Sequence, residues 1–151
     1  MKQIFKLKFS FTLISHSLKS IFYRYHSDKI NIIKQLMPRP KVVIDVGAHA
    51  GQVSKMISRA FSKKVKIIAI EPGLYARFIL RLSIFFNRLN NIDVLPFAVS
   101  DEQGFSFLNI PEKRKNSLGF GLSHMSNNHE DFTDRNFKTH YDYVSVTTID
   151  K

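Results

Sequence analysis

The amino-acid sequence predicts an α/β domain built around an open sheet of parallel strands. Three short apolar runs rich in β-branched residues, at 41–46, 66–70 and 92–99, are typical of buried strands. The segments between them, 52–61 and 74–89, carry apolar residues at helical spacing. Strands that alternate with helices form parallel sheets with right-handed crossovers. The 151 residues, of which 44% are hydrophobic, suffice for one domain with a core.

Residues 1–40 are predicted to form a basic, helical lead segment ahead of the domain at 41–151. Apolar residues in this segment recur at spacings of three and four, which places them on one face of a helix. Three interpretations of this amphipathic helix stay open. We favour docking on the domain behind it over contact with an anionic membrane surface through residues 1–26, or self-pairing as a coiled coil. The stripe consists of Ile4, Leu7, Phe11, Ile14, Leu18, Ile21 and Tyr25.

Positive charge is concentrated in the same lead segment. The net charge of the chain is +11, and residues 1–41 contribute +8, from nine Lys and Arg against Asp28. A nucleic-acid-binding domain clusters its basic residues over a folded binding face. We therefore expect no nucleic-acid partner.

The composition excludes several kinds of site. The chain has no Cys, so it has no disulfide, no Cys-ligated metal and no thiol nucleophile. No uncharged apolar run approaches the ~20 residues that a bilayer-spanning helix needs. No small-residue cleavage site follows the apolar stretch near the N-terminus. We expect a cytoplasmic protein, with peripheral membrane contact as the alternative location.

The remaining elements follow from local signals. A short helix is expected from a cap at Ser27 or Asp28 to Met37, because Pro38 and Pro40 cannot continue it. A half-exposed strand at 105–110 is expected to end at Pro111, followed by a long loop at 112–140 and a last strand at 143–149. The inner faces expected for the two crossover helices are Val53, Met56, Ile57, Ala60 and Phe61 for one, and Leu74, Phe78, Leu82, Phe85 and Leu89 for the other.

The strongest functional signal lies between the first strand and the helix after it, in the run Asp45 to Gly51 (DVGAHAG). Gly47 and Gly51 allow a tight turn and a close approach of a ligand to the backbone, and a helix N-terminus offers free N–H groups. Glu71 ends the second strand, where a carboxylate can accept both hydroxyls of a ribose. His49 stands where a dinucleotide site has its middle glycine, and the acid Asp45 suits a cationic ligand with an amino group better than a pyrophosphate. We therefore expect S-adenosylmethionine rather than NAD.

These segments resemble the FkbM-type methyltransferases over roughly residues 42–151. The resemblance rests on VIDVGAHAG, IAIEP, PFAVSD with Gly104, NSL and VSVTTID, in that order. It implies a class I, Rossmann-like methyltransferase domain that transfers a methyl group from S-adenosylmethionine to a hydroxyl of a sugar or polyketide-like acceptor. The family continues beyond the last of these motifs, so the resemblance also implies that this chain is the N-terminal part of such a domain, truncated after the first half of the sheet.

The resemblance assigns the cofactor contacts residue by residue. It places Asp45 toward the methionine amino group, through the loop that includes Ala48 and His49. At the position of His49 the family usually has Asn. Gly47 and Gly51 would admit the methionine end and Glu71 would hold the ribose. Asp101, with Ser100, would meet the adenine amino group.

Neither the catalytic base nor a metal site can be assigned from the sequence. His124, His129 and His140 lie in the expected loop without the spacing of a zinc site, and we expect no metal. Two alternatives stay open. The α/β part could be a non-catalytic scaffold for a membrane- or partner-binding helix, or the chain could be a nicotinamide-dependent oxidoreductase, which the missing middle glycine disfavours.

Overall fold

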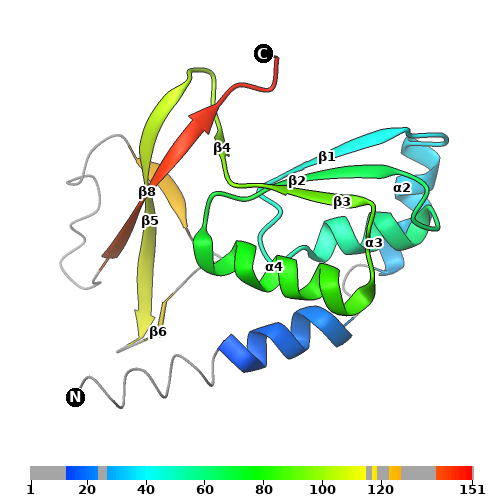
Figure 1. Cartoon of the computed structure of the whole chain (residues 1–151), viewed down its shortest axis with the longest axis horizontal. Helices are drawn as coiled ribbons and strands as arrows, with labels where there is room; N and C mark the ends of the chain where they lie inside the picture. Colours follow the sequence, from blue (N-terminus) through cyan, green and yellow to red (C-terminus); the bar gives the residue numbers. More distant parts are fainter. Residues whose placement is uncertain (1–12, 24–26, 115–116, 119–122, 127–138, 151) are drawn as a thin grey trace.

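The computed structural model describes residues 13–23, 27–114, 117–118, 123–126 and 139–150 (Figure 1). The fold is mixed α/β, as the sequence predicts. Its centre is a parallel sheet in the order β1-β2-β3, formed by Val42–Val46, Lys66–Ile70 and Ile92–Leu95. In this sheet Ile44 lies opposite Ile68, and Ile68 lies opposite Asp93.

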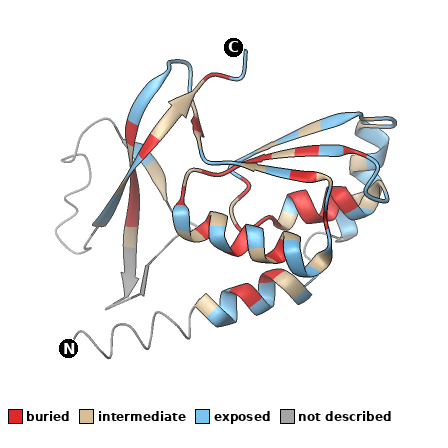
Figure 2. Cartoon of the chain, viewed as in Figure 1, coloured by how far each residue is buried: buried red, intermediate tan, exposed pale blue. Residues whose placement is uncertain are grey.

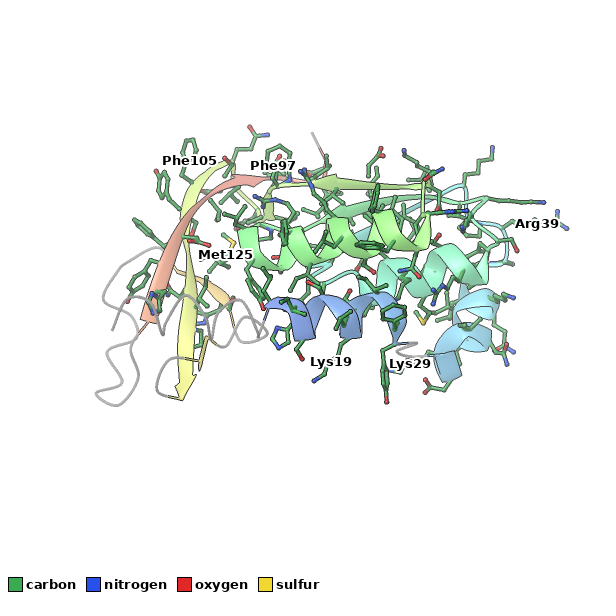
Figure 3. All side chains as sticks on the ribbon, turned by 60° about the horizontal axis from the view of Figure 1, so that its bottom comes forward. Lys19, Lys29, Arg39, Phe97, Phe105 and Met125 are labelled. Atoms are coloured by element: carbon green, nitrogen blue, oxygen red, sulfur yellow. The ribbon has the colours of Figure 1, made fainter. Side chains whose placement is uncertain are left out.

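Two helices make the crossovers between these strands. Helix α3 (Gln52–Ala60) joins β1 to β2, and α4 (Leu74–Asn87) joins β2 to β3. Both lie along the same face of the sheet, as Figures 1 and 3 show. The main core fills the space between them and the sheet. It consists of Ala48, Met56, Ile57, Ile67, Ala69, Leu80, Leu89 and Ile92.

A helix at 13–22 forms a third layer, on the far side of α3 and α4 from the sheet (Figures 1 and 3). A 3₁₀ turn, η1 (Ser27–Lys29), then leads into α2 (Ile30–Leu36), which packs on the core through Ile30 and Ile33. The expected cap of this short helix was wrong. Lys29 occupies the N-cap position without a side-chain hydrogen bond, because Ser27 and Asp28 already belong to the 3₁₀ turn.

The predicted inner face of α4 was wrong in part: Leu89, just beyond the end of the helix, is buried in the main core, but most of the expected stripe is not. Leu74, Phe78 and Phe85 are exposed, and the buried residues of the helix are Ala76, Ile79, Leu80 and Ser83. The physical reason is that α4 lies between two layers, the sheet and the 13–22 helix. Two of the four buried residues, Ala76 and Ser83, are small and let the neighbouring backbones approach closely, whereas Leu74, Phe78 and Phe85 face outward. In α3 the expected Met56 and Ile57 are buried, whereas Val53 is exposed.

A second sheet stands beside the first. Its path is β4-β8-β5-β6, and β7 also pairs with β5. Strand β4 runs parallel to β8, whereas β5 is antiparallel to β6, β7 and β8. A small cluster of Ala98, Leu108, Val144 and Val146 packs within it. The strand bounds are Ala98–Val99 for β4, Gly104–Arg114 for β5, Ser117–Leu118 for β6, His124–Ser126 for β7 and Thr139–Thr147 for β8.

This second sheet corrects three expectations. The expected strand 92–99 is two strands in different sheets, because Pro96 interrupts the ladder between β3 and β4. Pro111 does not end β5. It lies opposite Thr139, the first residue of β8, so its missing N–H group removes a hydrogen bond only at the end of the β5–β8 ladder. The region 112–140 contains β6, β7 and the start of β8, so it is not one continuous loop.

Strand β1 pairs with β2 alone among the described strands. Its side chains Val42, Ile44 and Val46 are exposed, because no described helix covers that face of the sheet (Figure 2). Apolar strand residues on an open edge favour association with other chains.

Candidate functional site

The loop after β1 turns back on the end of β2. The backbone N–H groups of Gly47 and Ala48 both donate to the carbonyl oxygen of Ile70, at 2.9 and 3.0 Å. Gly47, His49 and Gly51 have φ values of +72°, +48° and +77°. Three left-handed residues in five make this a tight turn, and two of them are glycines because that conformation is costly for other residues.

The two glycines have different roles. A Cβ on Gly51 would lie 2.2 Å from Cδ1 of Leu80 on α4, so this glycine is needed for close packing between the loop and the helix. A Cβ on Gly47 would meet no atom within 4 Å. Of the pair expected to admit a ligand, Gly47 therefore has the open space and Gly51 does not.

Glu71 joins this loop to the turn after β2. Its side chain is buried, and its Oε2 accepts the backbone N–H of His49 at 2.7 Å while Oε1 accepts the backbone N–H of Gly73 at 2.8 Å. Charge-assisted hydrogen bonds of this kind hold a carboxylate firmly. Each oxygen keeps a second lone pair, so Glu71 can still accept hydroxyl donors from a ligand.

Asp45 is positioned by α3. Its Oδ2 accepts the hydroxyl of the fully buried Ser54 at 2.5 Å. Burial raises the pKa of the Asp45 carboxyl because it disfavours the charged form, and the hydrogen bonds from Ser54 oppose that rise. The carboxylate is thus oriented by one neighbour before any ligand arrives.

Asp45, the loop and Glu71 converge on one cavity of about 560 Å³ at the carboxyl ends of β1 and β2. Of the eight residues that the resemblance assigns to the cofactor, five line this cavity: Asp45, Gly47, Ala48, His49 and Glu71. The opposite wall comes from the second sheet and its connections, and the sequence did not reveal it. It includes Phe97, Ala98, Val99, Leu108, Ser123, His124 and Met125.

The chain matches no family model, no curated protein and no solved structure.

The remaining expected cofactor residues lie apart from the cavity. Gly51 is packed against α4, and Ser100 and Asp101 are exposed at the turn after β4. The hydroxyl of Ser100 donates to Oδ1 of Asp101 at 2.8 Å, so these two side chains bond to each other. The structure does not bring them together with Asp45 and Glu71.

Two histidines face the cavity. Nε2 of His49 is buried and has no hydrogen-bond partner within the described part of the chain. His124 lies on β7, and its Nε2 is 3.4 Å from Nδ2 of the buried Asn109 on β5. Of the other two histidines considered for the base, His140 is exposed on β8 and His129 lies outside the described residues. His124 is therefore the loop histidine that the fold brings to the site.

Two further kinds of site have no counterpart in the described ranges. No group of three or more His, Cys, Asp or Glu side chains there could hold a metal ion. None of the helices within those ranges has the length and apolar character required to cross a membrane.

Proposed function

We propose that this protein is a class I methyltransferase that uses S-adenosylmethionine. The observation that carries the proposal is the convergence of Asp45, the 47–49 loop and Glu71 on one cavity at the carboxyl ends of parallel strands. Ligands of open α/β sheets bind at that edge. The cavity volume of about 560 Å³ lies within the range of small-molecule sites.

The chemistry of the cavity suits this cofactor. Two carboxylates, Asp45 and Glu71, face a space that would receive a sulfonium cation with a free amino group. Glu71 retains lone pairs for ribose hydroxyls, and the apolar wall formed by Phe97, Val99 and Leu108 suits a flat base. His49 stands where a pyrophosphate would need glycine, which argues against a dinucleotide.

The acceptor that we propose is a hydroxyl of a sugar or polyketide-like molecule. When bound, S-adenosylmethionine would supply the methyl group: its methyl carbon bonds to the acceptor oxygen as the carbon–sulfur bond breaks, and S-adenosylhomocysteine leaves. The residues of this chain would hold the reactants in line and exclude water. The hydroxyl proton needs a base, and His124 is a candidate because it lies in the wall of the same cavity.

Calorimetry with S-adenosylhomocysteine and with NAD tests the proposal. We expect S-adenosylhomocysteine to bind more tightly, and Glu71→Gln to weaken that binding by about 1–3 kcal/mol, the scale of a hydrogen bond to a charged group. Glu102→Gln is the matched control, because Glu102 is exposed and lies away from the cavity. Melting temperatures of both variants separate loss of binding from loss of folding.

Two results would contradict the proposal. Tighter binding of NAD would favour an oxidoreductase. Absence of binding to either molecule, by a chain that unfolds cooperatively, would favour the non-catalytic scaffold.

A further inference from the structure

The helix at 13–22 docks on the domain through its polar side. Ser17 and Ser20 are its buried residues, and the hydroxyl of Ser20 donates to the carbonyl of Ala50 at 2.8 Å. At the end of the helix, Nζ of Lys55 donates to the carbonyls of Ser20, Ile21 and Tyr23. Two side chains of α4 bond the same carbonyls, Ser83 to that of Ser20 at 3.1 Å and Asn87 to that of Ile21 at 3.2 Å.

Docking therefore leaves the apolar face of this helix unused. Ile14, Leu18 and Phe22 recur every four residues, and their exposed fractions are 55%, 50% and 75%. We call these three residues the outer stripe. Docking was the favoured interpretation of the apolar stripe, and the helix does dock, but Ile14 and Leu18 of that stripe face outward. An exposed apolar row on a docked helix indicates a further contact.

The stretch of sequence that contains the outer stripe is strongly positive. The segment 1–41 carries +8, and its described lysines, Lys19 on the helix itself and Lys29, Lys34 and Lys41 after it, are exposed. Figure 3 shows that Lys19 extends away from the body of the protein. Two copies of this segment would repel each other, which disfavours self-pairing. An anionic surface complements the charge, and lysine stems can lie along apolar material while their ammonium groups reach phosphate.

We propose that the 13–22 helix is an interfacial anchor that lies in the plane of an anionic membrane surface. The outer stripe enters the boundary between headgroups and acyl chains, and Lys19 stays at the level of the lipid phosphates. Such a helix needs an apolar face and a basic face and does not need to span the bilayer. Hydrogen bonds from Lys55, Ser83 and Asn87 fix the orientation of the helix on the domain. The outer stripe therefore faces outward before the protein contacts a membrane.

Flotation of the full chain with vesicles tests this proposal. Vesicles of phosphatidylglycerol mixed with phosphatidylcholine are compared with vesicles of phosphatidylcholine alone. The test variant carries Ile14→Ser, Leu18→Ser and Phe22→Ser. The matched control carries Leu36→Ser, Leu74→Ser and Phe85→Ser, which removes three apolar side chains that are 76%, 67% and 74% exposed on α2 and α4.

We expect the unaltered chain and the control to float with the anionic vesicles, less so at high salt, because screening weakens surface attraction. The stripe variant should bind about tenfold more weakly at an unchanged melting temperature, since its three replaced side chains already face solvent. Equal binding by the stripe variant would overturn the proposal, and so would equal binding to neutral vesicles. A dimer that the stripe variant dissociates, without vesicle binding, would establish self-pairing instead.

Discussion

Gly51→Ala is expected to destabilise the folded chain by about 2–4 kcal/mol, the sum of a backbone cost and a packing cost. The backbone cost arises because Gly51 has a φ of +77°, which alanine adopts only with strain. The packing cost arises because the new Cβ would lie 2.2 Å from Cδ1 of Leu80. Leu80 is 1% exposed and belongs to the main core, so its side chain has no open space into which to turn. Urea denaturation measures the loss.

Gly47→Ala is the matched control for this substitution. Its φ of +72° imposes a similar backbone cost, but its Cβ would meet no atom within 4 Å. We expect a loss of only about 1 kcal/mol. Gly47 lines the cavity and Gly51 does not. Relative to the stability that each variant loses, Gly47→Ala should therefore weaken cofactor binding more than Gly51→Ala does. Equal losses of stability in the two variants would mean that the contact with Leu80 costs nothing.

The strands and helices of the first sheet could be predicted because their signals are local. The apolar run at 66–70 matches β2 residue for residue, and the expected helix 52–61 differs from α3 by one residue. The buried faces could not be predicted in the same way. Periodicity identifies an apolar face, but it does not show which face a neighbour covers. In α4 and the 13–22 helix, buried serines mark the covered side, and the hydroxyls of Ser20 and Ser83 bond carbonyls of other elements.

The candidate site also has one part that local sequence signals predict and one part that they do not. Asp45 and Glu71 end adjacent parallel strands, so their meeting at one sheet edge follows from the order of elements. The opposite wall depends on pairing between distant strands, in which Leu108 lies opposite Met125. No local pattern in the sequence encodes that pairing. The proline at 96 could have indicated the break that separates β3 from β4, but it does not indicate that β4 joins β8.

Lys55→Met is expected to loosen the 13–22 helix from α3 and α4. Lys55 is 3% exposed, and its ammonium joins three backbone carbonyls at the end of that helix. Methionine replaces the aliphatic part of the side chain but lacks the terminal ammonium and donates no hydrogen bond. We expect stability to fall by about 2–3 kcal/mol, because hydrogen bonds to a charged group are lost within a buried contact. Amide hydrogen exchange within 13–22 should accelerate more than exchange in β2.

Lys63→Met tests whether burial is the reason for this effect. Lys63 also donates to carbonyls at a helix end, those of Asn87 at 3.4 Å and Arg88 at 2.9 Å, but it is exposed. We expect a change within about 0.5 kcal/mol, as for most surface substitutions. If Lys63→Met were as harmful as Lys55→Met, the buried position of Lys55 would not explain its importance.

The contribution of Lys55 should also depend on pH. Burial, together with repulsion from Arg59, lowers the pKa of Lys55 from its ordinary 10.5 to about 8. Between these two values the unfolded chain holds a proton that the folded chain has lost, so stability rises with pH, by at most about 1.4 kcal/mol per pH unit. Lys55→Met lacks this group, and its difference in stability from the unaltered chain should widen as pH rises through this window. The difference should stay constant below the window, where both states are protonated. If the stability difference between the two chains narrowed as pH rises, the three carbonyls would stabilise the ammonium by more than burial disfavours its charge.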